Sequence, residues 1–368
     1  MKVPFVDLKG QYLSIRDEID TAIATVIEEC SFIGGKHVEQ FESEFAKAYG
    51  MKHCISAANG TDTLYIILKM LGIGDGDEVI TVANSWISSS ETITQAGARP
   101  VFVDVNEDYF SIDENQIESK LTNRTKALIL VHLHGQACAI DEIQSFCKKN
   151  DIYLIEDCAQ SHFSGYKNKL VGTFGIASSF SFYPGKNMGA YGDAGCILTN
   201  DDSLSEKFRL YARHGALVKH QHKIEGINSR MDGLQAAILC QKLKHIHKWN
   251  ELRSHFAARY SALLNNISGV ATPKTRPETF HTFHLYVIKA RKREALMKFL
   301  KERGVETSIH YPTPLPFLEA YQYLGHSPND FPQVVALQSQ ILSLPLFPEI
   351  TEEQVLYVAN AVREFYTQ

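Results

Sequence analysis

The chain has 368 residues, of which 44% are hydrophobic, and a formal net charge of −5. This length allows one large and one small domain, and the lack of a Lys/Arg-rich run argues against a nucleic-acid binder. The first eight residues do not form a secretory signal, and no later apolar run reaches membrane-spanning length. Seven scattered cysteines without a CxxC pair predict free, mostly buried thiols. We therefore expect a cytoplasmic globular protein with neither nucleic acid nor membrane as partner.

Helical and strand-like segments alternate along the first half of the chain, as judged from the spacing of apolar residues. The expected helices cover residues 38–48, 61–70, 88–95 and 141–150, and the expected strands cover residues 53–57, 78–82, 101–103, 126–132 and 152–156. Because such alternation is typical of parallel strands, we expect an α/β fold with a mainly parallel sheet covered by helices on both faces. Ligands of such sheets bind at the carboxyl ends of the strands.

The pattern changes near residue 245, where a long helical stretch begins. A strand over residues 283–288 and a helix over residues 293–303 are expected after it. We therefore divide the chain into a large domain of residues 1–245 and a smaller C-terminal α/β domain of residues 246–368.

A single lysine, Lys186, stands in a glycine-rich turn after the strand-like residues 179–183. An isolated lysine is usually a solvated surface residue. Here, however, glycines at positions 185, 189, 192 and 195 allow the backbone to approach a bound group closely, and Ser181 adds a hydroxyl. An amine held between packed elements is partly desolvated, which lowers its pKa and favours attack on a carbonyl. We therefore expect Lys186 to form a Schiff base.

An acid pair, Glu156 and Asp157, follows directly after the apolar residues 152–155. A carboxylate at the buried end of a strand is costly unless a cation neutralises it. A protonated pyridine nitrogen is such a cation, and its partner acid allows pyridoxal phosphate to act as an electron sink. For this segment alone, a magnesium ligand or a helix cap is the alternative.

Residues 53–64 predict a strand, a glycine turn and the start of a helix. The amides of Gly60, Thr61 and Asp62 at this helix start can hold a phosphate, assisted by the helix dipole. Plain capping by Thr61 or Asp62 is the better interpretation of this segment alone. Together with the lysine and the acid pair, however, the segment completes a set of groups that few cofactors other than pyridoxal phosphate require.

Four segments carry a resemblance to a known family, namely residues 59–62, 156–162, 181–189 and 226–232. They resemble the DegT/DnrJ/EryC1/StrS sugar aminotransferases, and the resemblance extends from residues 4–8 to residues 309–312. It implies a fold-type I pyridoxal-phosphate-dependent transferase of deoxyamino-sugar biosynthesis, as used for surface polysaccharides such as O-antigen. It also implies a homodimer whose two active sites lie at the subunit interface.

The resemblance assigns roles to individual residues. Lys186 binds pyridoxal 5'-phosphate (PLP) covalently and Asp157 pairs with its pyridine nitrogen, and these two are the catalytic residues. The other residues implied for cofactor binding are Gly60, Thr61, Asp62, Trp86, Gln160, Ser181 and, from the partner subunit, Asn228. Core packing is the alternative for Trp86. Glutamate is implied as the amino donor, and the cofactor alternates with pyridoxamine phosphate (PMP), which predicts ping-pong kinetics.

Residues 213–230 contain many arginine, lysine and histidine side chains that can bind a diphosphate. The His-x-His run at His220 and His222, ahead of Gly-x-Asn-Ser-Arg, resembles the subgroup that acts at C-3 of dTDP-linked 3-keto-6-deoxyhexoses. The expected substrate-binding residues are Arg230, His220, His222, His310 and Tyr311. A surface loop or a metal site is the alternative for the histidine pair. Both the gluco and the galacto configuration at C-4 fit this sequence.

Other functions fit less well. The glycines of residues 72–77 follow a helix and precede a strand, the reverse of a dinucleotide-binding motif. A metal hydrolase using His132 and His134, which we expect to alternate along a strand, lacks a ligand set, so we expect no metal. PLP-dependent sugar dehydration requires a histidine where Lys186 stands. A C-4 aminotransferase acting on a 4-keto-6-deoxyhexose and a non-catalytic PLP-binding regulator remain as alternatives.

Overall fold

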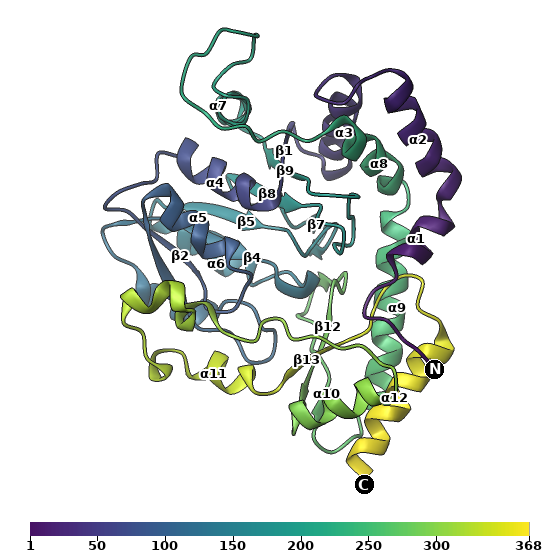
Figure 1. The fold of residues 1–368 in the computed structure, drawn as a ribbon. Coiled ribbons are helices and arrows are strands. Elements are labelled where there is room, and N and C mark those ends of the chain that lie inside the picture. Colours follow the sequence, from purple (N-terminus) through teal and green to yellow (C-terminus); the bar gives the residue numbers. More distant parts are fainter. Residues whose placement is uncertain (368) are drawn as a thin grey trace.

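The computed structural model of the protein describes residues 1–367 and is built around a seven-stranded sheet (Figure 1). The strands stand in the order β1-β9-β8-β5-β4-β2-β3. Their bounds are β1 His53–Ala57, β2 Glu78–Val82, β3 Arg99–Val103, β4 Thr125–Val131, β5 Tyr153–Asp157, β8 Ala177–Ser181 and β9 Gly195–Thr199. Strands β8, β5, β4, β2 and β3 pair in parallel, and β9 runs antiparallel to both β1 and β8. The expected mainly parallel sheet is confirmed.

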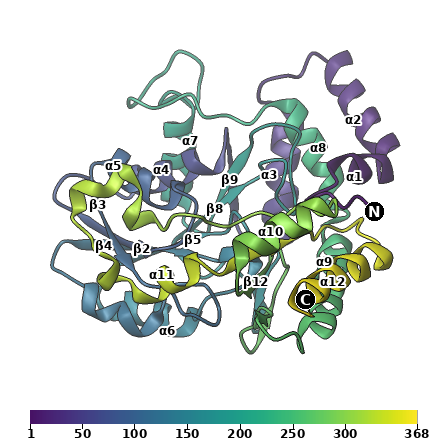
Figure 2. The ribbon, with the colours of Figure 1, turned by 60° about the horizontal axis from the view of Figure 1, so that its bottom comes forward.

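Helices cover both faces of this sheet. Figure 2 shows α4 and α5 on one side of it and α6 on the other. Helices α3 and α8 pack against each other, with α3 also against β1 and α2 against α8. The bounds of the helices in this half are α1 Leu8–Ser14, α2 Arg16–Glu28, α3 Lys36–Tyr49, α4 Gly60–Met70, α5 Ser88–Ala96, α6 Ile140–Lys149, α7 Asp202–Ala212 and α8 Gly233–Leu243.

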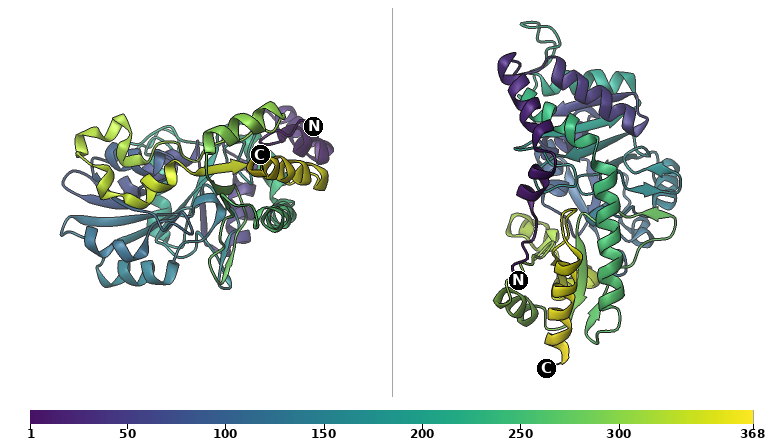
Figure 3. Two further views of the ribbon diagram at one scale, coloured as in Figure 1. Left: turned by 90° about the horizontal axis from the view of Figure 1, so that it is seen from below. Right: turned by 90° about the vertical axis from the view of Figure 1, so that its right-hand side faces the viewer.

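A second, smaller core lies around the antiparallel sheet β10-β12-β13. Helices α9 and α12 run side by side there (Figure 3). The elements of this part are α9 Ile246–Leu264, β10 Val270–Ala271, β12 Tyr286–Ala290, α10 Arg293–Glu302, β13 Ile341–Leu344 and α12 Glu352–Thr367. Val3 joins this core, whereas Phe331 and Leu337 of the segment around α11 (Pro332–Gln338) pack on the larger one. The division at residue 245 stays a prediction.

Most expected elements appear within a few residues of their expected bounds, and three details differ. Strand β4 ends at Val131, and His134 lies in a short 3₁₀ turn with φ of 60°. The expectation that His132 and His134 alternate along a strand is therefore wrong. Strand β12 begins at Tyr286 rather than at residue 283. The sequence did not predict the three-stranded sheet of β6 (Gly165–Tyr166), β7 (Lys169–Leu170) and β11 (Thr279–Phe280), whose strands have only two residues each.

The cysteines match their expected state. All seven lie in the described part of the chain and are free thiols, and all but Cys30 are buried. Among residues 1–367, no helix combines the length and the apolar character needed to cross a membrane.

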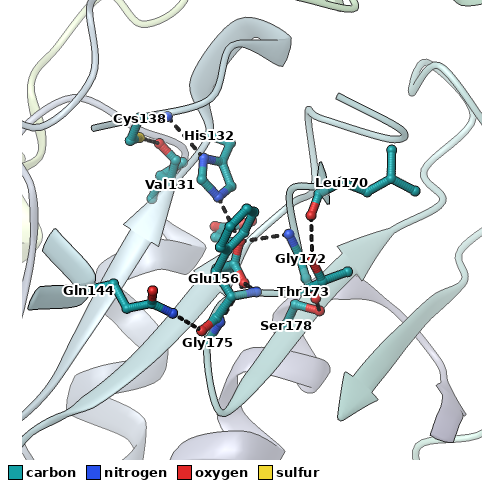
Figure 4. Close-up of polar contacts among 12 residues, drawn as sticks. Val131, His132, Cys138, Gln144, Glu156, Leu170, Gly172, Thr173, Gly175 and Ser178 are labelled. Atoms are coloured by element: carbon teal, nitrogen blue, oxygen red, sulfur yellow. Dashed lines mark hydrogen bonds and ion pairs between the residues drawn. The ribbon is translucent and has the colours of Figure 1, made fainter. Parts of the chain in front are cut away.

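Glu156 joins β5 to the loop that precedes β8 (Figure 4). Its carboxylate is fully buried and accepts hydrogen bonds from the backbone N–H groups of Gly172 (2.6 Å), Phe174 (2.7 Å) and Gly175 (2.7 Å). Its Oε1 also lies 3.1 Å from Nε2 of His132. Backbone amides thus stabilise the carboxylate of Glu156, so of the acid pair only Asp157 is left for the expected cation.

The one group of three potential metal ligands found among residues 1–367 is His132, Glu156 and Cys158. Nδ1 of His132 accepts the N–H of Cys138 (3.2 Å), so the ring carries its proton on Nε2 and donates it to Glu156. Burial raises the pKa of the Cys158 thiol well above its ordinary value, so the sulfur stays protonated. Hydrogen bonds within the protein therefore account for this group.

Replacing Glu156 by glutamine should destabilise the protein. An amide NH₂ cannot accept the N–H groups that the carboxylate oxygen accepts, so at least one buried donor loses its partner, at a cost of about 3 kcal/mol. We expect the urea midpoint of Glu156→Gln to fall clearly. The matched control, Glu319→Gln on the exposed surface, should leave the midpoint unchanged. Equal midpoints for the two variants would show that the loop does not depend on this carboxylate.

Candidate active site

A cavity of about 540 Å³ opens where three neighbouring parallel strands end. Val131, Asp157 and Ser181 are the last residues of β4, β5 and β8, and all three line the cavity. This is the edge at which α/β sheets bind ligands. The cavity also brings together most of the residues expected from the sequence, namely Gly60, Thr61, Trp86, Asp157, Gln160, Ser181, Lys186, His310 and Tyr311.

Lys186 projects into this cavity from a tight turn. The backbone of Gly189 passes so close to Pro184 that a Cβ at Gly189 would lie 2.2 Å from the Pro184 carbonyl oxygen. Only glycine permits this approach, which brings the chain back on itself just after the lysine. Burial lowers the pKa of Lys186 to about 8, while the negative charge of Asp157 works in the opposite direction. About one tenth of this amine is therefore neutral and nucleophilic at pH 7, far more than of an ordinary lysine.

Asp157 is buried at the end of β5. Its Oδ2 accepts a hydrogen bond from Oγ of Ser89 (3.0 Å) and its Oδ1 accepts one from the N–H of Ala159 (3.1 Å). Burial raises the pKa of Asp157, and these two hydrogen bonds and the charge of Lys186 oppose that rise. The carboxylate retains lone pairs that can accept a proton donor from a cofactor.

The start of α4 and the end of β8 form a cradle of amides and hydroxyls. A Cβ at Gly60 would lie 2.6 Å from Cβ of Ser181, so this contact requires glycine. Asn59 caps the helix by accepting the N–H of Asp62 (2.8 Å), so the expected cap at Thr61 or Asp62 is wrong and the amide of Asp62 is already engaged. Asp62 itself does not line the cavity. The amides of Gly60 and Thr61 belong to the first turn, where N–H groups have no intrahelical partner.

Three further side chains lie around the lysine. The amide of Gln160 has a fixed orientation, because its Oε1 accepts the N–H of His134 (2.7 Å) and its Nε2 donates to the hydroxyl of Tyr311 (2.9 Å). Trp86 is 59% exposed and its ring centre lies 5.9 Å from that of Tyr311. An indole this exposed at a cavity is available to a ligand, so the alternative of core packing does not hold for Trp86.

His310 lines the cavity from the second half of the chain, where its Nδ1 lies 2.8 Å from Oγ of Ser343. Burial, with the charge of Lys186, lowers the pKa of His310 to about 4. This histidine is therefore neutral at physiological pH and can bind a substrate through a neutral ring.

Besides Asp62, four expected site residues do not line this cavity. Asn228, Arg230, His220 and His222 belong to the loop between α7 and α8, which projects from the body of the molecule in Figure 1. His220, His222 and Arg230 are exposed, and Nδ1 of His222 lies 2.7 Å from the carbonyl oxygen of His214. Within one chain the loop does not reach the lysine.

The structure adds cavity residues that the sequence did not single out, among them Phe5, Ser89, Arg253 and His284. The sequence could have indicated Ser89 as a site residue, because it stands only three residues after Trp86. Nothing in the sequence indicated Arg253 and His284, since each lies in an element expected to belong to the small domain. Only tertiary packing brings them to the cavity.

The residues of the cavity fit PLP. Lys186 offers an amine to an aldehyde, Asp157 offers a buried carboxylate to a pyridinium, and the cradle of Gly60, Thr61 and Ser181 offers donors to a phosphate. The cradle can form only because Gly60 lacks a Cβ.

Comparison with known proteins decides the family. The model of the DegT/DnrJ/EryC1/StrS aminotransferase family matches residues 13–363. The chain belongs to this family. It is therefore a PLP-dependent sugar-nucleotide aminotransferase, as the resemblance of its motifs implied.

Two proteins with similar sequences carry different names. A "pleiotropic regulatory protein" of Geobacillus stearothermophilus is 42% identical over 100% of this chain and 99% of its own. A dTDP-3-amino-3,6-dideoxy-alpha-D-galactopyranose transaminase of Aneurinibacillus thermoaerophilus is 40% identical over 99% of both chains.

Solved structures of similar proteins agree with the fold. DesV of S. venezuelae, in complex with a ketimine intermediate, superimposes with a TM-score of 0.97 at 37% identity, covering 100% of this chain and 99% of its own. NtdA of Bacillus subtilis, with bound cofactor PMP, has a TM-score of 0.92 at 30% identity, covering 100% and 86%. The expected fold class and cofactor are confirmed.

Removing the charge of Asp157 should shift the titration of Lys186. The carboxylate favours the ammonium form, so Asp157→Asn should lower the pKa of the lysine from about 8 by about one unit. The measurement is the rate at which an arylating reagent labels Lys186 in cofactor-free protein against pH, read by peptide mapping. Asp193→Asn, which changes an exposed carboxylate at the same cavity, is the control and should leave the midpoint in place. An unchanged midpoint in Asp157→Asn would contradict the electrostatic coupling.

Proposed function

We propose that this protein transfers an amino group from glutamate to C-3 of a dTDP-linked 3-keto-6-deoxyhexose. The observation that carries the amino transfer is the meeting of Lys186 and Asp157 in one cavity, with the phosphate cradle beside them. The C-3 position is supported by the His220-x-His222 run and by the 40% identity to a transaminase named for a 3-amino product. The nucleotide is proposed from the same relative.

PLP, when bound, supplies an aldehyde that condenses with amines and a ring that spreads negative charge from the carbon beside the nitrogen. Lys186 would hold the cofactor in the resting enzyme. Once a substrate amine replaces it, its Nζ would take the proton from the donor carbon and deliver it to the cofactor, a task suited to a pKa near 8. Asp157 would keep the pyridine nitrogen protonated, and Gln160 would approach the ring hydroxyl. Glutamate and the keto sugar would use the same cofactor and the same Lys186 in turn, which predicts ping-pong kinetics.

We propose a homodimer in which each cavity is completed by the projecting loop of the other chain. That loop carries Asn228, for the phosphate, and Arg230, His220 and His222, for the substrate diphosphate. Its apolar side chains Leu217, Val218 and Ile224 are 42–56% exposed, which favours burial against a partner. His310 and Tyr311 would contact the sugar from within the same chain.

The regiochemistry can be tested directly. We expect the holoenzyme, given glutamate and a dTDP-linked 3-keto-6-deoxyhexose, to form a product whose NMR spectrum shows nitrogen at C-3, with the corresponding 4-keto sugar a poor substrate. Lys186→Ala should lose turnover and the borohydride-reducible chromophore, whereas Lys248→Ala, at an exposed lysine of α9, should keep both. Amination at C-4 alone would refute the C-3 proposal, and no amination of either sugar would favour a regulatory role.

Shared active sites predict complementation between two inactive variants. Lys186→Ala and Asn228→Ala should each be strongly impaired alone. After the subunits are mixed and exchanged, half of the dimers are mixed, and each of these contains one site with both wild-type residues. We expect about one quarter of the wild-type activity, by simple counting of random dimers. No recovery in a mixture that contains mixed dimers would show that Asn228 serves the cavity of its own chain.

A further inference from the structure

A chain of buried amides leads from the large domain to His284 at the cavity. Nδ2 of Asn250 donates to the carbonyl oxygen of His162 (2.9 Å), which leaves Oδ1 of Asn250 to accept Nδ2 of Asn187 (2.9 Å). Nδ2 of Asn187 also donates to the carbonyl oxygen of Thr282 (3.1 Å). Both asparagines are buried, and each orientation is fixed by a backbone carbonyl, which can only accept.

This chain fixes the tautomer of His284. Because Nδ2 of Asn187 is the donor toward two acceptors, its Oδ1 is the atom that faces Nδ1 of His284 at 3.1 Å. An oxygen can only accept there, so Nδ1 of His284 must carry hydrogen. In a neutral imidazole the other nitrogen, Nε2, is then a bare acceptor.

His284 is neutral at its place in the cavity wall. Burial, together with the nearby charges of Lys186 and Arg253, holds the pKa of His284 well below its ordinary value. A base this weak does not retain a proton near neutral pH, so it is unsuited to general base catalysis. Its lone pair can still accept a hydrogen bond.

We propose that Nε2 of His284 accepts a hydrogen bond from a hydroxyl of the keto sugar and so selects the second substrate of the reaction. This inference rests on the proposed function. An ionised glutamate has carboxylates that only accept hydrogen bonds, so it offers no side-chain donor to a bare nitrogen, whereas a sugar brings several hydroxyls. His284 is thus a specificity residue for the half-reaction with the sugar and has no effect on the half-reaction with glutamate.

Two substitutions separate this role from a structural one. His284→Asn places an amide near the position of Nδ1, so it retains the donor toward Asn187 but loses the acceptor in the cavity. His284→Gln extends an amide toward the position of Nε2, so its oxygen replaces the acceptor while the donor toward Asn187 is lost. The two half-reactions are followed separately on the holoenzyme, by the loss of visible absorbance with glutamate and its return with dTDP-3-keto-6-deoxyhexose.

We expect His284→Asn to raise the half-saturating concentration of the keto sugar about tenfold, the size of one lost hydrogen bond, and to change that of glutamate less than twofold. His284→Gln should stay within about twofold of wild type in the sugar half-reaction. The glutamate half-reaction also reports that each variant is folded and loaded with cofactor.

The opposite pattern, in which His284→Gln is impaired and His284→Asn is not, would show that the ring acts only through Asn187 and would overturn the proposal. Equal loss in both half-reactions, or no loss with His284→Asn, would overturn it as well. A wild-type PMP form that reacts with neither a 3-keto nor a 4-keto sugar would instead refute the proposed function, and this inference with it.

Discussion

The buried carboxylate of Asp157, held beside the amine of Lys186, is the constraint on which the site depends. Burial works against both charges, raising the pKa of the acid and lowering that of the lysine, while each charge partly offsets the effect on the other. The neighbouring acid, Glu156, has a different environment, since three backbone amides and the ring of His132 already donate hydrogen bonds to its carboxylate. Of two adjacent acids, one anchors a loop and the other retains capacity for a cofactor.

The sequence predicted the architecture well where local pattern and tertiary structure agree. Strands β1 and β2 have the bounds expected from their apolar runs, because a turn signal stands at each end. Lys186, Asp157 and Gly60 were found for the same reason, since each lies at the carboxyl end of a strand of the seven-stranded sheet or within five residues after it. Such a sheet places the residues at its strand ends together without further information.

The sequence did not reveal contacts between distant segments. Asn187 and His284 are 97 residues apart, and Gln160 and Tyr311 are 151 residues apart, so no local pattern pairs them. The N-cap residue of α4 was predicted wrongly for a different reason. Asn59, Thr61 and Asp62 are all good caps, and the choice fell to Asn59 because its extended backbone lets the side chain reach the amide of Asp62. His134 lies in a left-handed turn rather than in the expected strand, and its N–H orients the side chain of Gln160.

The site divides into two parts with different physical demands. The groups that we expect to bind the amine and the cofactor ring come from strand ends and tight turns within one chain, where close packing fixes their positions. The expected diphosphate-binding groups lie on the projecting loop, whose exposed apolar side chains need a partner surface. If the loop binds the diphosphate as we propose, a change in it would alter substrate contacts without disturbing Lys186 or Asp157.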